Sequence, residues 1–301
     1  MIGDAITAMQ VAVRDHLASG SSAVQLDGMI GTAVHWRPHV FQPTEHVGWH
    51  LQSVTPDSSS WENRILRAIA TDPKLHIGVA TTVETLRDAA FLLGCQRIGA
   101  RIILLKERKD SFVVEDSFAS VPDFVCERKI RLDSEVARSM LDFALERALR
   151  AKTNVAKGVT LEVLVALILS QVENFEVANV GISNRTQQMD VLVHNRSVGG
   201  VLASSPLVLA EAKNWRNKKV TPTEHALFLR KLASRNRRAK LGFLVTTGGF
   251  TSGVGLEARR DSMEDIVIVC IDGNTLPKLW RTHESITQQI ERLVIKASVG
   301  S

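Results

Sequence analysis

The sequence is poor in cysteine and has neither a long apolar run nor a recognisable leader. Its three cysteines, Cys95, Cys126 and Cys270, are far apart and flanked by apolar residues, which predicts buried thiols in a reducing compartment. The longest nearly apolar run, residues 161–169, is broken by an acid and is well short of the ~20 residues of a membrane-spanning helix. The N-terminus has no basic segment followed by an apolar core, so we predict no signal peptide. These absences favour a cytoplasmic protein without a membrane segment.

Tyrosine is absent, and aromatic residues make up only 5% of the 301 residues. Surfaces that bind single-stranded nucleic acids stack bases on exposed aromatic side chains, so this class of protein is mildly disfavoured. The rest of the composition, 45% hydrophobic and 23% charged, is ordinary for a globular protein. At ~150 residues per domain, the length predicts about two domains.

We place the domain boundary near residues 150–156, between an N-terminal domain (1–150) and a C-terminal domain (151–301). Residues 133–151 repeat apolar residues at helical spacing and are expected to form a helix that connects the two. The N-terminal domain alternates helical and strand patterns, which indicates an α/β layer. We expect its helices at 4–18, 61–70 and 83–93, and its strands at 23–30, 33–35, 47–54, 75–80 and 101–106.

The C-terminal domain is predicted to run helix, strand, strand, strand, helix, strand. The second helix has a clear start, because Thr221 can cap it, Pro222 suits its first position and Glu224 completes a capping box. We expect helices at 159–173 and 222–235 and strands at 176–182, 189–194, 206–212 and 241–247, followed by a short helix from 253, a strand at 266–271 and a helix at 283–297.

Charged residues occupy specific places in this order. Strand residues alternate between faces, so Glu211 and Lys213, at the end of the third strand, point the same way. The preceding residues 206–210 are apolar, as in a buried central strand, and isolated buried charges are costly. Asp190 in the neighbouring strand could supply a second carboxylate, and the Ala212 carbonyl another oxygen. Such oxygen ligands suit Mg²⁺ or Mn²⁺.

Together with Glu162 in the first helix and the stretch from Leu241 to Gly253, these residues carry a resemblance to a known group of enzymes. The C-terminal domain resembles the PD-(D/E)xK nuclease superfamily, and within it most closely the Mrr-like restriction endonucleases, over about 120 residues. Two features differ from the Mrr-like pattern. Those proteins often have Gln where this chain has Glu211, and a glycine-rich approach to the aspartate where this chain has residues 185–188.

The resemblance implies a restriction-endonuclease-like αβββαβ core and a metal-dependent endodeoxyribonuclease, with a role in restriction or antiviral defence. It implies that Asp190 and Glu211 hold one or two Mg²⁺ or Mn²⁺ ions, which Glu162 reaches directly or through water. The ion would polarise the scissile phosphate and lower the pKa of a water molecule. Lys213 would stabilise the resulting hydroxide and neutralise charge on the phosphate. The implied catalytic set is Glu162, Asp190, Glu211 and Lys213.

Positive charge is concentrated next to these residues. Residues 213–240 contain ten basic residues and one acid, in a chain with a net charge of +5. A concentrated basic segment predicts a polyanionic partner, although a solvated helix face has a similar composition. Trp215 could stack on a base or pack internally. We assign phosphate contacts to Lys218, Lys219, Arg230, Lys231, Arg235, Arg237 and Arg238.

The N-terminal domain loosely repeats the element order of the C-terminal domain, and its residues 76–82 resemble residues 241–247. In this alignment Asp27 matches Asp190, whereas His50 and Gln52 replace Glu211 and Lys213. We therefore hypothesise a decayed, inactive copy of the nuclease fold, used for binding or dimerisation. The alternative is an unrelated α/β domain.

Four histidines of this domain, His35, His39, His46 and His50, are close in sequence. A zinc site is disfavoured because no cysteine lies nearby and Pro38 prevents His35 and His39 from sharing a helix face.

Three functions remain open from the sequence. The leading one is a DNA endonuclease acting on duplex DNA, and the alternative is a non-cleaving nucleic-acid-binding protein of the same fold. An RNA-directed nuclease is the third. If each subunit makes one cut, a double-strand break requires a homodimer. Regulation of a harmful activity is also expected, and an activating partner protein is one way to provide it.

Overall fold

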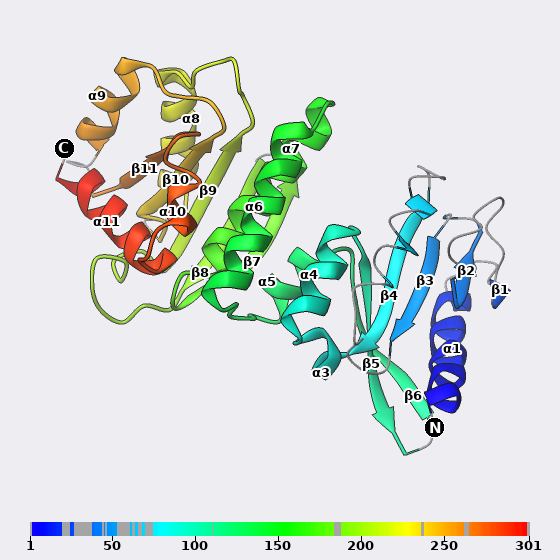
Figure 1. The fold of residues 1–301 in the computed structure, drawn as a ribbon. Coiled ribbons are helices and arrows are strands. Elements are labelled where there is room, and N and C mark those ends of the chain that lie inside the picture. Colours follow the sequence, from blue (N-terminus) through cyan, green and yellow to red (C-terminus); the bar gives the residue numbers. More distant parts are fainter. Residues whose placement is uncertain are drawn as a thin grey trace. The chain divides into compact units, whose positions relative to one another are not determined.

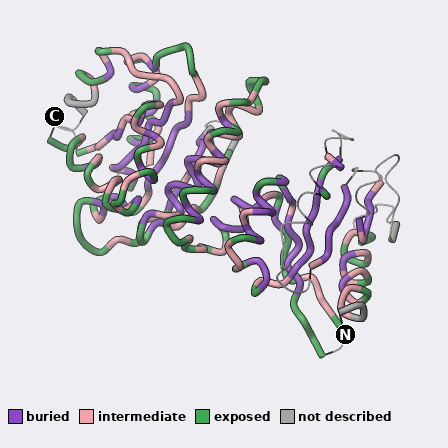
Figure 2. The backbone as a smooth tube through the Cα atoms, viewed as in Figure 1, coloured by how far each residue is buried: buried purple, intermediate pink, exposed green. Residues whose placement is uncertain are grey.

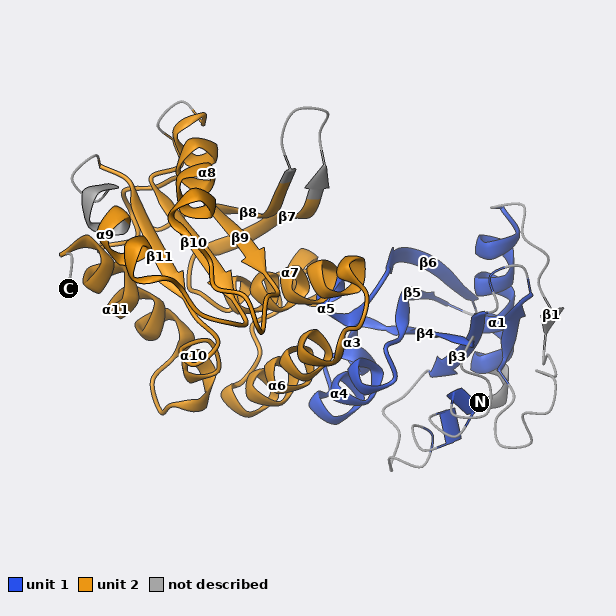
Figure 3. Cartoon of the chain, turned by 90° about the horizontal axis from the view of Figure 1, so that it is seen from above, with its two compact units in different colours: residues 1–124 blue, residues 125–301 orange. Residues whose placement is uncertain are grey.

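The structure is a computed structural model, which describes residues 2–19, 25–26, 38–43, 45, 47–52, 61, 64–65, 68–69, 75–109, 111–183, 188–235, 238–261 and 265–299. The protein is a mixed α/β chain that divides into two compact units, residues 1–124 and residues 125–301, shown in separate colours in Figure 3. In the described part of the chain, no helix combines the length and the apolar character needed to cross a membrane.

Unit 1 is built on a six-stranded sheet in the order β1-β2-β3-β4-β5-β6 (Figure 1). β1, β2 and β3 pair antiparallel, β3, β4 and β5 pair parallel, and β6 returns antiparallel to β5. The elements are α1 (Ile2–Ala18), β1 (Gln25–Leu26), β2 (Val40–Gln42), β3 (Val47–Gln52), β4 (His76–Thr82), α3 (Val83–Leu86), α4 (Ala89–Arg97), β5 (Arg101–Arg108) and β6 (Ser111–Phe118). Helical residues, Trp61 among them, are also described between β3 and β4.

Unit 2 is built on a five-stranded sheet in the order β11-β10-β9-β8-β7. β7, β8 and β9 pair antiparallel, whereas β9, β10 and β11 pair parallel. Its elements, preceded by α5 (Val121–Glu127), are α6 (Ser134–Arg150), α7 (Asn154–Ser170), β7 (Phe175–Ser183), β8 (Gln188–Asn195), β9 (Leu207–Lys213), α8 (Pro222–Ala233), β10 (Leu241–Thr246), α9 (Ser252–Asp261), β11 (Val267–Ile271), α10 (Lys278–Arg281) and α11 (Ile286–Ser298).

The core of unit 2 lies between its central strands and the helices that cover them. β9 and β10 are buried along most of their length, and these central strands are mostly purple in Figure 2. The long helix α7 packs on β7, β8 and β9, and its apolar second half, from Leu161 on, is mostly buried. The order α7, β7, β8, β9, α8, β10 is the helix, three strands, helix and strand expected from the sequence.

The two sheets share one pairing pattern. From β1 to β5 and from β7 to β11, the successive pairs are antiparallel, antiparallel, parallel and parallel. A long helix precedes each sheet, and helical residues lie between the third and fourth strands and between the fourth and fifth strands of both. The element order that the sequence suggested for both halves is therefore present in both units.

The division of the chain differs from the boundary expected at residues 150–156, because it falls between Phe124 and Val125. α6 packs along α7 and buries Met140, Leu141 and Ala144, so this helix is part of unit 2 and is not a free connector. The helix expected at 83–93 is two helices, because the Asp88 side chain accepts a hydrogen bond from the Phe91 backbone and caps α4.

Four short or edge elements among the described residues were not expected from the sequence, namely β2, β6, α5 and α10. Of the strand expected at 23–30, only Gln25 and Leu26 are described as strand. The strand expected at 33–35 and Asp27 lie outside the described residues. The strand that pairs with β3 as β8 pairs with β9 is β2, so the position of Asp190 corresponds to His39, and the match of Asp27 to Asp190 was wrong.

Candidate active site

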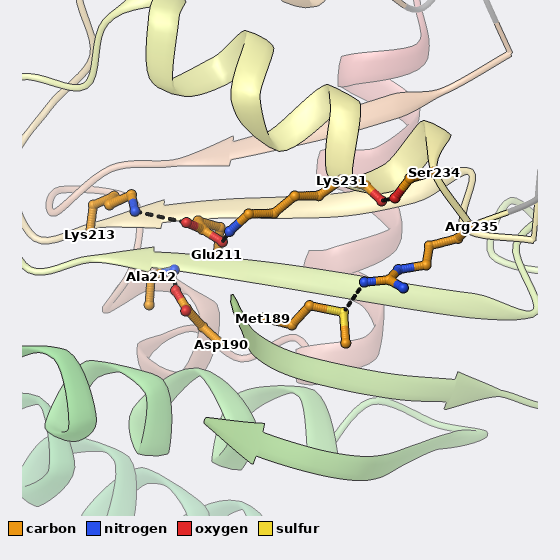
Figure 4. A network of polar contacts seen from close by, with 8 residues as sticks. All are labelled: Met189, Asp190, Glu211, Ala212, Lys213, Lys231, Ser234 and Arg235. Atoms are coloured by element: carbon orange, nitrogen blue, oxygen red, sulfur yellow. Dashed lines mark hydrogen bonds and ion pairs between the residues drawn. The ribbon is translucent and has the colours of Figure 1, made fainter. Parts of the chain in front are cut away.

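Glu211 and Lys213 form an ion pair at the end of the central strand β9 (Figure 4). Their side chains lie on one face, as the alternation of strand residues requires, and Lys213 Nζ is 2.7 Å from Glu211 Oε1. Glu211 is 7% exposed. A carboxylate with so little water around it needs cations or donors nearby, and Lys213 is one of them.

Asp190 lies beside Glu211 on the neighbouring strand β8. β8 and β9 are antiparallel and Val191 pairs with Ala210, so Asp190 lies opposite Glu211 on the neighbouring strand. Asp190 is buried, and its Oδ2 accepts a hydrogen bond of 2.7 Å from the backbone N–H of Ala212. Burial, together with the negative charge of Glu211, raises the pKa of Asp190, although the Ala212 hydrogen bond and two lysines oppose the rise. The two acids therefore repel one another in a dry site.

Lys231 is also a member of this site, although the sequence placed it only among the phosphate contacts. It projects from α8, and its Nζ is 2.7 Å from Glu211 Oε2. Each oxygen of the Glu211 carboxylate thus faces its own ammonium group, Lys213 on one side and Lys231 on the other (Figure 4). The signal that could have identified Lys231 is its position on the helix that follows β9, but its reach depends on how the helix packs.

Glu162, the remaining acid of the expected set, is half-buried on α7. Burial, followed by the charges of Asp190 and Glu211, raises the pKa of Glu162 to about 7. Its carboxylate lies against two glycines, since a Cβ added at Gly181 would be 3.3 Å from Glu162 Oε2 and one at Gly158 would be 3.5 Å from Oε1. Gly181 has a φ of +68°, a conformation that suits glycine. The acid therefore lies within electrostatic reach of the other two.

A divalent cation fits the chemistry of this donor set. Asp190, Glu211 and Glu162 are hard oxygen ligands of the kind that Mg²⁺ and Mn²⁺ bind. A cation would relieve the mutual repulsion that raises the pKa of Asp190 and of Glu162. Within the described ranges, however, no three His, Cys, Asp or Glu side chains are gathered closely enough to hold a metal ion. Side-chain rearrangement around Glu211, whose oxygens both contact lysines, would accompany binding.

The end of β9 is anchored by polar residues that the sequence analysis did not single out. Asn214 Nδ2 donates to the carbonyl oxygens of Ala148 at 2.8 Å and Lys157 at 3.0 Å, which ties the strand to α6 and α7. Its Oδ1 accepts a hydrogen bond of 2.8 Å from the Thr247 hydroxyl. Thr246 Oγ1 donates to the backbone carbonyl of Lys213 at 2.8 Å. These contacts fix the backbone that carries Glu211 and Lys213.

The basic residues of the expected nucleic-acid surface are distributed unevenly around this site. Lys218 lies over the Trp215 ring, with Nζ 3.9 Å from the ring centroid, and is 3.7 Å from a Glu224 oxygen. Arg235 Nη2 contacts Met189 Sδ at 3.0 Å, next to Asp190. Arg237 lies outside the described residues. The exposed members of the set are Lys218, Lys219, Arg230 and Arg238.

Unit 1 has a closely comparable arrangement at the same place in its sheet. Thr81 pairs with Gln52 as Thr246 pairs with Lys213, and Thr81 Oγ1 donates to the Gln52 carbonyl at 2.6 Å, the counterpart of the bond from Thr246. His50 and Gln52 are in contact, with Nε2 3.0 Å from Oε1. They occupy the positions that Glu211 and Lys213 have in unit 2.

The pair in unit 1 is uncharged. Burial, followed by the nearby His39, lowers the pKa of His50 to about 4, so the imidazole is neutral at pH 7. His50 stacks on Trp61 with ring centroids 5.3 Å apart. His39 uses Nδ1 to accept a hydrogen bond from the Leu51 backbone, and the other two histidines of the group, His35 and His46, are outside the described residues.

Comparison of the chain with models of protein families, with curated proteins and with solved structures gave no match.

Proposed function

We propose that unit 2 is a divalent-metal-dependent endonuclease that hydrolyses phosphodiester bonds of DNA. The observation that carries the proposal is the pair of buried carboxylates, Asp190 and Glu211, held beside Lys213 at the end of a central strand. A buried acid with a raised pKa, such as Asp190, beside a cationic group is typical of functional sites. Together with the order of elements in unit 2, they support a restriction-endonuclease-like fold for this unit.

In this proposal Asp190 and Glu211 hold the Mg²⁺ or Mn²⁺ ion, and Glu162 reaches it directly or through water. A bound ion would polarise the scissile phosphate and lower the pKa of a water molecule. Lys213, 2.7 Å from Glu211, lies where it can stabilise negative charge on the attacking water and on the phosphate. Asp190 remains oriented because the Ala212 N–H donates to one of its oxygens.

A nucleic acid is the substrate that the charge distribution favours. Residues 125–301 contain 26 basic and 18 acidic residues, whereas residues 1–124 contain 11 basic and 14 acidic residues. The unit that carries the candidate site therefore has the net positive charge, and Lys218, Lys219, Arg230 and Arg238 expose part of it to solvent. Such residues contact phosphates and position a polyanion without reading its sequence.

Unit 1 is proposed to be a degenerate copy of the same fold that does not cleave. The support is the shared pairing pattern of the two sheets and the equivalent hydrogen bonds from Thr81 and Thr246. The neutral pair His50 and Gln52 stands where an acid and a lysine stand in unit 2. A binding or dimerisation role is therefore proposed for unit 1.

The test is cleavage of supercoiled plasmid in Mg²⁺ or Mn²⁺ by the wild-type protein and by Lys213→Ala and Asp190→Ala. We expect cutting by the wild type and a loss of at least about 100-fold in each variant, because each removes charge stabilisation at the phosphate or the ion. Mn²⁺ binding by the whole chain should disappear in Asp190→Ala. If Asp190→Ala still binds Mn²⁺ and loses it only when His50 is also substituted, the result would contradict the inactive role of unit 1.

A non-cleaving nucleic-acid-binding protein is the second candidate. The observation in its favour is that both Glu211 oxygens are already occupied by lysines and that the described residues hold no ready-made group of three ligands. Tight DNA binding without cutting, under several metals and with methylated DNA and RNA substrates, would establish this second function in place of the first.

A further inference from the structure

Glu211 is held by two lysines that come from different elements. Lys213 belongs to the same strand, but Lys231 is 20 residues further along the chain on α8. Both ammonium groups are 2.7 Å from a Glu211 oxygen, and the Lys231 side chain is only 23% exposed. A lysine that merely covers a DNA-binding surface would extend into solvent, because a charged head group prefers water. Lys231 instead points inward to the carboxylate.

The packing of α8 sets the position of Lys231. The start of the helix is fixed by the capping box between Thr221 and Glu224. Phe228 and Leu232 anchor its inner face in the core, and they approach β10 closely because Gly242 has no Cβ. A Cβ at Gly242 would lie 2.8 Å from the Phe228 ring and 2.7 Å from a Leu232 methyl carbon. Lys231 is therefore directed to Glu211 by a helix that is anchored on both sides of it.

We propose that Lys231 is a residue of the candidate active site that competes with the divalent cation for the Glu211 carboxylate and then contacts the substrate phosphate. The proposal rests on the proposed nuclease function and adds a residue to it. When a cation takes up Glu211 Oε2, the ammonium loses its partner and becomes available to a DNA phosphate. Lys231 thus holds Glu211 in place before the ion binds and neutralises substrate charge afterwards.

This role predicts opposite changes in metal binding and in cleavage. In Lys231→Met, the site loses one positive charge and the competitor for Glu211, so we expect Mn²⁺ to bind about five- to tenfold more tightly. Cleavage at saturating Mn²⁺ should slow by about tenfold or more, mainly in kcat, because a cation near the phosphate is lost. Lys231→Arg keeps the charge and should return Mn²⁺ affinity toward the wild-type value.

The experiment is a calorimetric titration of the full-length protein with Mn²⁺, with plasmid cleavage as a second readout. Arg230→Met is the matched control, because Arg230 is the exposed neighbour of Lys231 on the same helix; it should leave Mn²⁺ affinity unchanged. Thermal unfolding in EDTA establishes that each variant is folded.

The proposal is overturned if Lys231→Met binds Mn²⁺ no more tightly than the wild type, or if it binds more tightly but cuts at the wild-type rate. A wild-type protein that binds Mn²⁺ but never cuts contradicts the nuclease function alone, and the comparison of affinities still decides the competition by Lys231. Absence of Mn²⁺ binding in both proteins overturns both proposals.

Discussion

The carboxylates of Asp190 and Glu211 are buried, and the half-buried Glu162 lies within electrostatic reach of both. The pKa of Glu162 is raised to about 7, chiefly by burial and then by the other two acids, and that of Asp190 is raised by burial and then by Glu211. Raised pKa values mean that the folded protein without a cation is strained electrostatically at neutral pH. Lys213 and Lys231 offset only part of this repulsion.

The first prediction at this scale concerns Glu162→Gln in the metal-free protein. A raised pKa in the folded state stabilises the protonated form, so the stability that this group contributes is present below pH 4.5 and is lost as the pH rises through about 7. The glutamine side chain in the variant does not ionise, so the variant does not undergo this loss of stability. We therefore expect the variant to exceed the wild type in unfolding free energy by about 1 kcal/mol at pH 8, a value reduced for the half-exposed side chain.

Urea unfolding in EDTA at pH 4.5 and pH 8 would measure this difference. The two proteins should be equally stable at the lower pH, and Mn²⁺ should reduce the advantage of the variant at the higher pH. A variant that is less stable than the wild type at pH 8 in EDTA would show that the Glu162 carboxylate is not under electrostatic strain.

How far the sequence could predict single residues depended on whether their contacts are local. Glu211 and Lys213 are two residues apart in a strand, so their contact followed from the alternation of strand side chains. Lys231 and Asn214 could not be assigned in this way. Lys231 reaches Glu211 only because α8 packs closely on β10, and Asn214 bonds to backbone carbonyls of α6 and α7. Both depend on tertiary packing that no local pattern encodes.

At the scale of elements, the end of β9 is joined to α6 and α7 by hydrogen bonds. Asn214 alone links the strand to the carbonyls of Ala148 and Lys157, near the end of α6 and the start of α7. The same α7 carries Glu162, so one amide side chain sets the separation between the strand that holds two site residues and the helix that holds a third.

We predict that Asn214→Ala lowers both stability and cleavage. Loss of the amide leaves two carbonyl groups without their donor, which costs about 1–3 kcal/mol in unfolding free energy. Cleavage should fall by at least tenfold, because small displacements of catalytic groups are costly. Thermal unfolding and plasmid cleavage would measure the two effects. Asn217→Ala, in the same loop but exposed, is the control and should change neither property, whereas equal effects of both substitutions would contradict a specific role for Asn214.

Long periodic elements were predictable and edge elements were not. The capping signals around Thr221 placed the start of α8 correctly, and the apolar runs of β9 and β10 identified the central strands. β6 was missed because its residues are mostly exposed or half-buried, so it lacks the apolar pattern of an inner strand. The break between α3 and α4 depends on the Asp88 cap, which outweighs a continuous helical pattern.

At the scale of the whole chain, the place of α6 decides where unit 2 begins. The buried face of this helix includes Met140, Leu141, Ala144 and Ala148, and it packs along α7. Asp142, also on α6, accepts hydrogen bonds from Trp280 Nε1 at 2.9 Å and from Arg281 Nε at 2.8 Å. α6 is therefore bound to unit 2 at two places far apart in the sequence.

We predict that a fragment of residues 128–301 folds cooperatively, whereas a fragment of residues 151–301 does not. Without α6, the apolar surface of α7 is exposed to water, and the hydrophobic contribution of the buried face of α6 is lost. Circular dichroism, thermal unfolding and binding of a hydrophobic dye would compare the fragments. A shorter fragment that melts cooperatively at the temperature of the longer one would contradict the assignment of α6 to unit 2.

The shared pairing pattern of the two sheets also gives the chain an internal reference. A threonine hydroxyl donates a hydrogen bond to the backbone carbonyl of Gln52 in unit 1 and of Lys213 in unit 2. Because both units have this bond, it belongs to the shared backbone arrangement and not to the charged site. The acid and the lysines occur in one unit only, and their place in the other is filled by a neutral histidine stacked on an indole. The same substitution made at equivalent positions of the two units would therefore distinguish, within one molecule, the residues that maintain the fold from those that serve chemistry.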